Sequence, residues 1–487
     1  MKQLAKHEKQ PILFLDAGAL LFQGATIPAD RLAAQQAKAD GIIKAVQAMG
    51  LTAAGIAPQD LAGGIDYLVR AQRKTRFPWL SMNLVRQTDR RPLFAPFIIT
   101  KTGSTRVAVL GLTGRVPGPP GNTDGNFMVL PWHDVLRDTL AKVRNRADMV
   151  ILLSSYPYPV NERIARRFHG IHLIIQSGHA TANLPPKQVD NTLICQVGAK
   201  GGYLGRLDIR WNASQRWRHD FSGQLRTVQD RLDRTNWLIK RNKWLKRHSP
   251  RDRSALDERY RELLDTRDKL RTEIRQLQKR SRTGEEGLCA YTNSFISIKA
   301  TIPEDRAVEA IIVQAARTVN RINRKRLQRW RQQFRTTNRA GQGHANNPDP
   351  GLAALAGWQT CRTCHPGQTA FWLKTGHARA WRTLAAVNQQ FNLNCLVCHV
   401  TLPTDDKTTG YNTEQRLALL PSTFNNVGCE ACHGPGKEHA RQPKRVGMRK
   451  AGAAVCLTCH TPEHDNNFDF KHKLKKIRCP AIPAPAA

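Results

Sequence analysis

The sequence predicts a chain of three structural classes: a layered α/β domain, an α-helical coiled-coil hairpin, and a loop-rich, mainly α domain. The first prediction rests on strand-like and helix-like stretches that alternate from residue 11 to residue 211. The second rests on apolar residues that recur every seven positions between residues 221 and 283. The third rests on a pentapeptide that occurs four times after residue 357, where strand signals are few.

Short apolar runs separated by amphipathic stretches define the α/β domain, which we assign to residues 1–215. The runs are rich in Val, Ile and Leu, which is typical of parallel strands buried on both faces. The predicted strands are Ile12–Leu15, Trp79–Asn83, Arg106–Gly111, Met149–Leu153 and His172–Ile175, followed by an edge hairpin of Thr192–Val197 and Tyr203–Trp211. Helical spacing runs from Asp30 to Met49, from Trp132 to Arg146 and from Val160 to Phe168. This alternation indicates a layered α/β fold.

Residues 221–283 have a different pattern, in which apolar side chains repeat with a period of seven. In the second half of the segment these residues are Leu256, Leu263, Leu270 and Leu277. The period predicts an antiparallel helical hairpin with coiled-coil-like seams and a tip at Ser249-Pro250. Its outer face is rich in Arg and Lys, which fits either docking to an anionic surface or acidic protein or an ordinary solvated face.

The chain after the hairpin completes the first domain and then leads to a separate one. Ser294–Ile302 alternates like a strand, and Pro303 opens a long helix that runs to about Phe334. We therefore assign residues 286–336 to the end of the first domain. Residues 337–356 are rich in Asn, Gly and Pro, which is typical of a linker. Residues 357–480 form the last domain.

The last domain contains the pentapeptide C-x-x-C-H at residues 361–365, 395–399, 429–433 and 456–460. This is the attachment signature of c-type haem: two thiols form thioethers with the vinyl groups, and the histidine binds the iron. Zinc, the main alternative, does not explain a histidine after every cysteine pair. We therefore expect four covalently bound c-type haems. The attachment residues are Cys361, Cys364, Cys395, Cys398, Cys429, Cys432, Cys456 and Cys459, and the iron ligands are His365, His399, His433 and His460.

The composition is strongly basic, with 76 Lys and Arg against 38 acidic residues and a formal net charge of +38. Such a charge indicates an anionic partner or simply serves solubility. No apolar run reaches the roughly 18 residues of a transmembrane helix, and the first residues are too polar for a signal-peptide core. Because this kind of haem attachment usually takes place outside the cytoplasmic membrane, we expect a periplasmic or extracellular protein. Its start should then lie upstream, with a signal peptide and a first strand.

Residues around the pentapeptides form a second set of motifs: Trp372-x4-His377-x-x-Ala380, Asn394–Thr401, Val427–Gly436 with His439 behind it, and Cys456–Thr461 with Phe468. In these motifs the segment from Trp358 to about Lys473 resembles the nitrifier-type tetrahaem cytochromes c, which are related to the electron acceptor of hydroxylamine oxidation. In that family most haems have a second axial histidine and one can lie open. The resemblance implies sixth ligands at His377 and His439, with His472 and His464 as further candidates. Such bis-histidine ligation implies low reduction potentials.

Several segments of the first domain follow one another in the order known from another family: Leu15–Gly18, Ser81–Asn83, Val109–Thr113, Ala147–Ser154, Gly170–His179 and Gly198–Gly205. In these segments the domain resembles the metallophosphoesterase domain of bacterial 5′-nucleotidases. The resemblance implies a dinuclear metal site held by several carboxylates and imidazoles.

The positions that carry metal ligands in that family have lost them here. Ala19 stands in place of a Gly-Asp aspartate, Ser155 in place of a Ser-His histidine, and Thr181 in place of one histidine of Gly-His-x-His. The Gly-Asn-His-Glu motif is replaced around Ala57–Asp60. His179 alone cannot hold two metals. We therefore expect no phosphoesterase metals and assign no catalytic residue.

Together these patterns predict an exported multihaem c-type cytochrome that passes electrons to redox partner proteins such as other cytochromes. The nucleotidase-like domain is then a scaffold or docking surface. The alternatives are an active metal-dependent phosphoesterase and an open-haem reductase of a small nitrogen or sulfur compound. Three cysteines lie outside the pentapeptides. Cys195 and Cys289 form either a disulfide or two buried thiols, and Cys479 has no assigned role.

Overall fold

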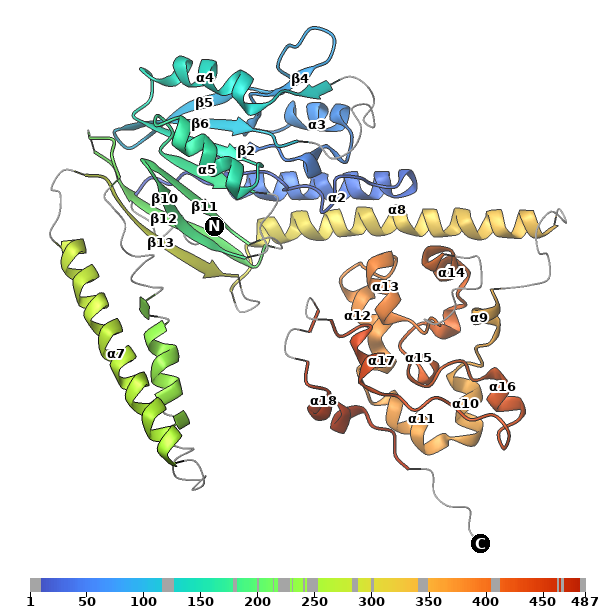
Figure 1. Cartoon of the computed structure of the whole chain (residues 1–487). Helices are drawn as coiled ribbons and strands as arrows, with labels where there is room; N and C mark the ends of the chain where they lie inside the picture. Colours follow the sequence, from blue (N-terminus) through green and yellow to red (C-terminus); the bar gives the residue numbers. More distant parts are fainter. Residues whose placement is uncertain are drawn as a thin grey trace. The chain divides into compact units, whose positions relative to one another are not determined.

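The computed structural model divides the chain into two compact units (Figure 1). The first comprises residues 1–27 and 43–305, and the second comprises residues 28–42 and 306–487. Helix α2 (Ala29–Ala48) contributes to both. The domain limits expected from the sequence stay predictions. The structure describes residues 10–115, 127–177, 182–198, 201–212, 214–217, 228–229, 231–239, 241–242, 253–282, 288–298, 302–339, 349–403, 412–461, 464–465 and 468–481.

A six-stranded sheet forms the core of the first unit, in the order β10-β11-β9-β8-β6-β5. Its strands are β5 (Phe97–Thr102), β6 (Thr105–Leu112), β8 (Met149–Ser154), β9 (Leu173–Gln176), β10 (Leu184–Val189) and β11 (Thr192–Gln196). The four central strands are parallel, and β5 and β10 are antiparallel edges. Every residue of β8 is buried, as expected of a strand covered on both faces. The predicted α/β fold of this region is confirmed.

Alternate residues of the sheet face two different hydrophobic clusters, because successive side chains of a strand point to opposite faces. Leu152 packs with residues of α4 (Trp132–Val143) and α5 (Tyr158–Arg167). Its neighbour Ile151 packs in the other cluster, with Ala53 and Leu80. The latter two come from a small parallel sheet of β1 (Leu15–Asp16), β2 (Ala53–Gly55) and β3 (Trp79–Leu80). The remaining elements here are η1 (Pro58–Leu61), α3 (Ile65–Gln72), β4 (Leu84–Arg86) and β7 (Phe127–Val129).

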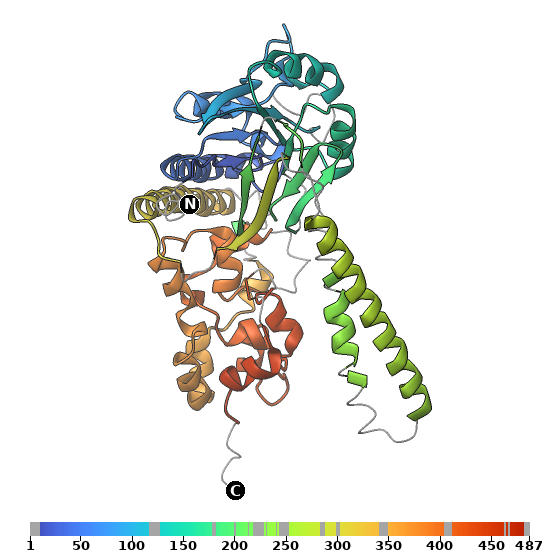
Figure 2. The same cartoon turned by 90° about the vertical axis from the view of Figure 1, so that its left-hand side faces the viewer.

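The predicted edge hairpin is wrong in its pairing. β11 lies between β9 and β10, whereas β12 (Tyr203–Arg210) pairs antiparallel with β13 (Ala290–Ser297) in a separate sheet (Figures 1 and 2). Two prolines in β10 explain the arrangement, since a strand that lacks backbone donors is confined to a sheet edge. β10 pairs with the edge of β11 that β9 does not occupy, and β12 pairs with β13, which follows the hairpin segment in the sequence. The strand expected at Ser294–Ile302 therefore begins earlier, at Ala290, and pairs outside the main sheet.

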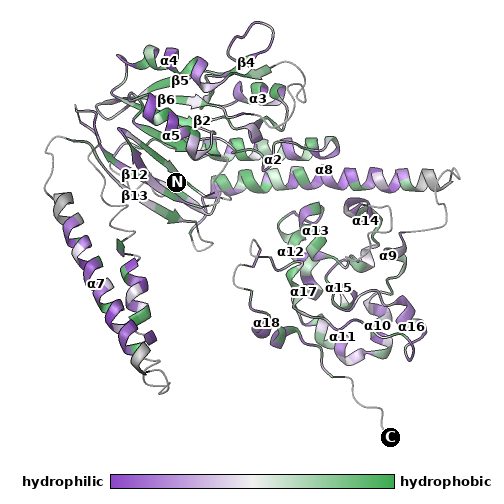
Figure 3. Ribbon diagram, viewed as in Figure 1, coloured by the Kyte–Doolittle hydropathy of each residue, from purple (hydrophilic) through white to green (hydrophobic). Residues whose placement is uncertain are grey.

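Helix α7 (Arg253–Arg282) is the long second arm of the expected hairpin, and Figure 3 shows it as mostly hydrophilic. Leu270 and Ile274 of α7 are buried against Val228 and Leu232 of the preceding segment. This apolar contact fits two packed helices. The coiled-coil hairpin stays a prediction, because its tip at residues 249–250 and the side chain of Leu277 lie outside the described residues.

The second unit is helical. Its elements are α8 (Arg306–Arg339), α9 (Pro350–Ala353), α10 (Trp358–Cys364), α11 (Pro366–Leu373), η4 (His377–Arg379), α12 (Ala380–Ala386), α13 (Leu393–His399), α14 (Thr413–Leu419), η5 (Ser422–Phe424), α15 (Cys429–His433), α16 (Lys437–Arg441), α17 (Ala453–Leu457) and α18 (Phe470–Ile477). Leu327 of α8 joins Leu396 and Leu417 in one apolar cluster. Arg416 forms a salt bridge of 2.8 Å with the fully buried Asp349. None of the helices in the described residues has the length and apolar character that a membrane crossing needs.

Candidate functional site

The four pentapeptides lie on or beside short helices, namely α10, α13, α15 and α17. Three of these helices begin after a glycine and the fourth after Asn392, whose side chain accepts the Asn394 N–H. Residues three apart in a helical turn lie on the same side. The local structure therefore directs both thiols of a pair toward the same side, as attachment to one planar group requires.

Backbone carbonyls and one carboxylate orient several of the site histidines through Nδ1. A carbonyl oxygen can only accept, so the ring nitrogen beside it must be the donor, which leaves Nε2 free to bind a metal. The Nδ1–acceptor distances are 2.9 Å for His399 and Ala380 O, 3.0 Å for His433 and Arg449 O, 2.6 Å for His439 and Val446 O, and 3.0 Å for His460 and the Asp465 carboxylate. These contacts hold imidazoles in the tautomer that haem iron binds.

Two pairs of imidazoles face each other at the separation expected for a shared metal ion. The ring centroids of His365 and His439 are 6.2 Å apart with planes 12° from parallel, and those of His377 and His460 are 6.2 Å apart at 64°. A metal–imidazole bond is about 2 Å long, so two imidazoles on one ion have centroids roughly 6 Å apart. The structure thus brings a candidate sixth ligand opposite two of the four pentapeptide histidines. The residues fit a bis-histidine haem in both places.

His377 also has the protonation state that a ligand needs. Burial, and then the nearby imidazoles of His460 and His399, lower its pKa. The ring is therefore neutral at pH 7, and only a neutral imidazole binds a metal ion. By contrast, His464 and His472 form no ring pair among the residues that the structure describes. His472 is exposed in the first turn of α18, where its backbone N–H donates to the Asp469 carboxylate.

The cysteine pairs meet across the domain in a defined combination. The thiols of Cys361 and Cys429, from the first and third pentapeptides, share a hydrogen bond. Cys398 and Cys459, from the second and fourth, do the same. In each pair the hydrogen bond lowers the pKa of one thiol and raises the pKa of the other. The first attachment site is thus adjacent to the third, and the second to the fourth.

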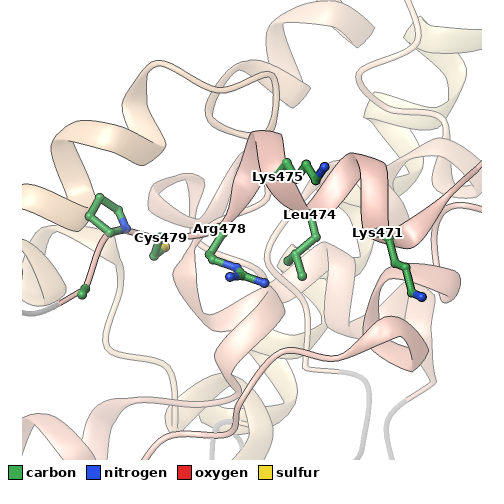
Figure 4. A pocket seen from close by; sticks show the side chains of 7 residues that line it. Lys471, Leu474, Lys475, Arg478 and Cys479 are labelled. Carbon is green, nitrogen blue, oxygen red and sulfur yellow. The ribbon is translucent and has the colours of Figure 1, made fainter.

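The three cysteines outside the pentapeptides are free thiols. Cys195 and Cys289 do not form a disulfide, so of the two alternatives the structure has the free thiols. Burial raises the pKa of the Cys195 thiol to about 12. Cys479 lines a surface cavity of about 620 Å³ beside α18, together with Lys471, Lys475 and Arg478 (Figure 4). These three cations make the cavity a second basic surface.

The nucleotidase-like positions of the first unit lie where β1, β2 and β8 end. They are filled by direct packing between loops. A Cβ on Gly18 would lie 2.7 Å from the Ala57 nitrogen, which leaves no room between the loops after β1 and β2. Ser155 accepts the Gly114 N–H at 2.7 Å and donates to the Ile56 carbonyl at 3.3 Å. His179 and Thr181 lie outside the described residues.

Asp60 is one of two neighbouring carboxylates in this region, and three backbone N–H groups donate to it. It is fully buried and accepts the N–H groups of Ala19 at 2.7 Å, Leu21 at 2.9 Å and Ala57 at 2.9 Å. Burial raises the pKa of Asp60, and burial raises that of the neighbouring Asp16 to about 7. Within the described residues, no three side chains of His, Cys, Asp or Glu gather closely enough to hold a metal ion. Asp60 acts here as a clamp between two loops.

Sequence reasoning missed one residue of the haem-attachment region, Glu430. It is buried inside the third pentapeptide and accepts three backbone N–H groups. The available signal was an acid between the two cysteines, followed by Gly434-Pro-Gly436, a loop rich enough in glycine to wrap a carboxylate.

Comparison with known proteins gives a separate result for each unit. The profile of the family "Cytochrome c554 and c-prime" matches residues 360–434. Cytochrome c-554 of Nitrosomonas europaea is 28% identical over 111 residues, which cover 20% of this chain and 45% of that protein. The 2′,3′-cyclic-nucleotide 2′-phosphodiesterase/3′-nucleotidase of Salmonella typhimurium is 26% identical over 175 residues, which cover 32% of this chain and 27% of that protein.

Among solved structures, a calcineurin-like phosphoesterase of Bacillus subtilis aligns with a TM-score of 0.40 and 15% identity, over 66% of this chain and 88% of that one. The chain spans less than half the length of the two curated relatives. The pentapeptide region is similar to the cytochrome c-554 family, and the α/β region is similar to the nucleotidases and phosphoesterases.

Proposed function

We propose that this protein is an exported electron-transfer protein that binds four haems covalently in its second unit. The observation that supports this most is the arrangement of imidazoles. Two of the four pentapeptide histidines face a second histidine at a ring-centroid distance of 6.2 Å. Three of the four are oriented by a hydrogen bond of Nδ1. Bound haem supplies a one-electron Fe(III)/Fe(II) couple. The chain determines where each couple lies and which groups bind its iron.

The proposed ligand sets link pentapeptides that are distant in the sequence. His439, which follows the third pentapeptide, is the sixth ligand opposite His365 of the first. His377, which follows the first pentapeptide, is the sixth ligand opposite His460 of the fourth. His472 and His464 remain candidates at the second and third sites, one of which can be open. Bis-histidine ligation keeps the potentials low.

Electron transfer in this proposal follows the adjacency of the attachment sites. The hydrogen-bonded thiols support close approach of the first site to the third and of the second to the fourth. We propose that electrons pass within these two pairs and enter or leave through partner proteins such as other cytochromes. Basic surfaces on the hairpin and beside α18 suit acidic partners. The proposed location is periplasmic or extracellular.

The nucleotidase-like region serves in this proposal as a scaffold or docking surface without catalysis. Its support is the tight packing of the loops after β1 and β2 and the engagement of Asp60 with three backbone donors. A carboxylate that accepts three N–H groups in a closed loop has little capacity left for a metal. Hydrolysis of 5′-AMP or an aryl phosphate with added manganese or zinc tests this. Metal-dependent turnover that His179→Ala abolishes would make the domain a phosphoesterase.

The decisive experiment is a haem count on the exported protein. Acid–acetone extraction should leave the colour on the polypeptide, and the alkaline pyridine spectrum should give four haems per chain. A double substitution of Cys456 and Cys459 by Ala should lower the count to three, which identifies the fourth site. Bound zinc with no haem would refute the proposal. A spectral change with small nitrogen or sulfur ligands at one haem would instead favour the reductase alternative.

A further inference from the structure

Glu430 occupies an unusual environment for an acid in such a basic chain. It is 5% exposed, and its partners are neutral backbone groups. Oε1 accepts the N–H groups of Ala356 and Gly436, both at 2.8 Å, and Oε2 accepts the N–H of Gly357 at 2.9 Å. Three N–H donors on one buried carboxylate suit its ionised form, which only accepts hydrogen bonds.

The donors come from both sides of a boundary between two attachment sites. Gly357 is the N-cap of α10, which carries the first pentapeptide, and its φ of 86° is a conformation that favours glycine. Gly436 lies in the loop after the third pentapeptide, and Glu430 itself lies within that pentapeptide. The carboxylate therefore fastens the start of one attachment helix to the other attachment site. The hydrogen bond between Cys361 and Cys429 lies in the same region.

We propose that Glu430 is a positioning residue that holds the first and third haems side by side and lowers the potential of the haem beside it. The inference rests on the proposed function. A buried negative charge stabilises the ferric state, which carries one more positive charge than the ferrous state. Low polarity around the carboxylate strengthens this interaction, because few water molecules screen it. One residue thus provides both the spacing and the electrostatic bias of this haem pair.

The test compares Glu430→Gln with Glu438→Gln in the full-length haem protein. Both substitutions remove one negative charge next to a predicted haem-binding residue, but Glu438 has an exposed side chain paired with Arg441. Redox titration followed by visible and EPR spectra should show that the reduction potential of at least one haem in the E430Q protein is higher than in the parent by about 59 mV or more. That shift is a tenfold change in its redox equilibrium constant. E438Q should stay close to the parent, because water screens the exposed charge.

Further measurements separate the possible failures. A parent without haem would refute the proposed function. A parent with four haems and an E430Q variant with unchanged potentials would refute the inference alone. If E430Q does not fold, Glu430→Asp decides, because it keeps the charge on a shorter side chain. For E430D, potentials like those of the parent together with a lower midpoint of thermal unfolding would support the inference. A loss of stability in E430D accompanied by raised potentials would refute the electrostatic role.

Discussion

Replacing Asp60 by Ala is expected to destabilise the first unit strongly. The substitution removes the acceptor of three backbone N–H groups, of which those of Leu21 and Ala57 belong to buried residues. Ala19, the third donor, is only half-buried, so water can replace its acceptor. The loops after β1 and β2 then lose the group that joins them.

The magnitude follows from the two buried donors. A buried backbone group without a partner costs about 1–3 kcal/mol, which gives roughly 2–6 kcal/mol for both. Part of this is offset, because burial raises the pKa of Asp60 and the variant has no carboxylate to desolvate. For a domain of roughly 150–250 residues, about 1 kcal/mol lowers Tm by about 2–4 °C. We therefore expect Tm of the first unit to fall by about 10 °C.

Scanning calorimetry would measure this fall, and hydrogen exchange would locate it in the peptides that contain Leu21 and Ala57. The matched control is Asp66→Ala, which removes an exposed acid from the first turn of α3 and should cost less than about 1 kcal/mol. If Tm of D60A lies within about 2 °C of this control, the clamp role assigned to Asp60 is wrong.

Three further predictions concern the candidate ligand histidines, a buried ion pair and Asp16. His439→Ala and His377→Ala should each convert one low-spin ferric haem to high spin, and parent-like spectra would contradict these ligand assignments. Arg416→Ala leaves the buried Asp349 without its ion-pair partner and should cost about 3–5 kcal/mol in denaturant unfolding; a cost under about 1 kcal/mol would argue against a structural ion pair. Burial raises the pKa of Asp16 from 3.8 to about 7, so the folded state holds its proton more tightly than the unfolded state. Stability of the first unit should therefore fall from pH 4 to pH 7, and Asp16→Asn should flatten that slope; an unchanged slope would refute the assignment.

Local patterns were sufficient for the four central strands of the main sheet, whereas the edge strands β5 and β10 were not predicted. Met149–Leu153 is a run of five apolar residues, which is typical of a strand covered on both faces, and β8 spans Met149–Ser154. Pairing was harder, because β12 joins a strand that follows it after nearly eighty residues of intervening chain. No local signal encodes such a partner. The sequence signal that bears on this pairing is the two prolines of β10, which exclude it from a sheet centre.

In the candidate site, too, the features set by local spacing could be predicted, and the contacts between residues distant in the sequence could not. Spacing identifies the cysteine pairs and their following histidines, because attachment to one group demands a fixed local geometry. The partners of His365 and His460 could not be read from spacing, since His439 follows the third pentapeptide and His377 follows the first. Glu430 was missed for a similar reason: its role depends on donors that lie more than seventy residues before it.

The division of helix α2 between the two units has a consequence for how the chain can be cut. Residues 28–42 belong with residues 306–487, although both flanking segments belong to the other unit. At Gly41 the helix approaches α8 so closely that a Cβ would lie 2.3 Å from that of Ala315, and Asp30 accepts a hydrogen bond from Arg326. A gene fragment that starts at residue 306 would therefore lack a packed helix, and truncation there would expose the α8 face. The two halves are interleaved rather than joined end to end, so recombination could not exchange them with a single crossover.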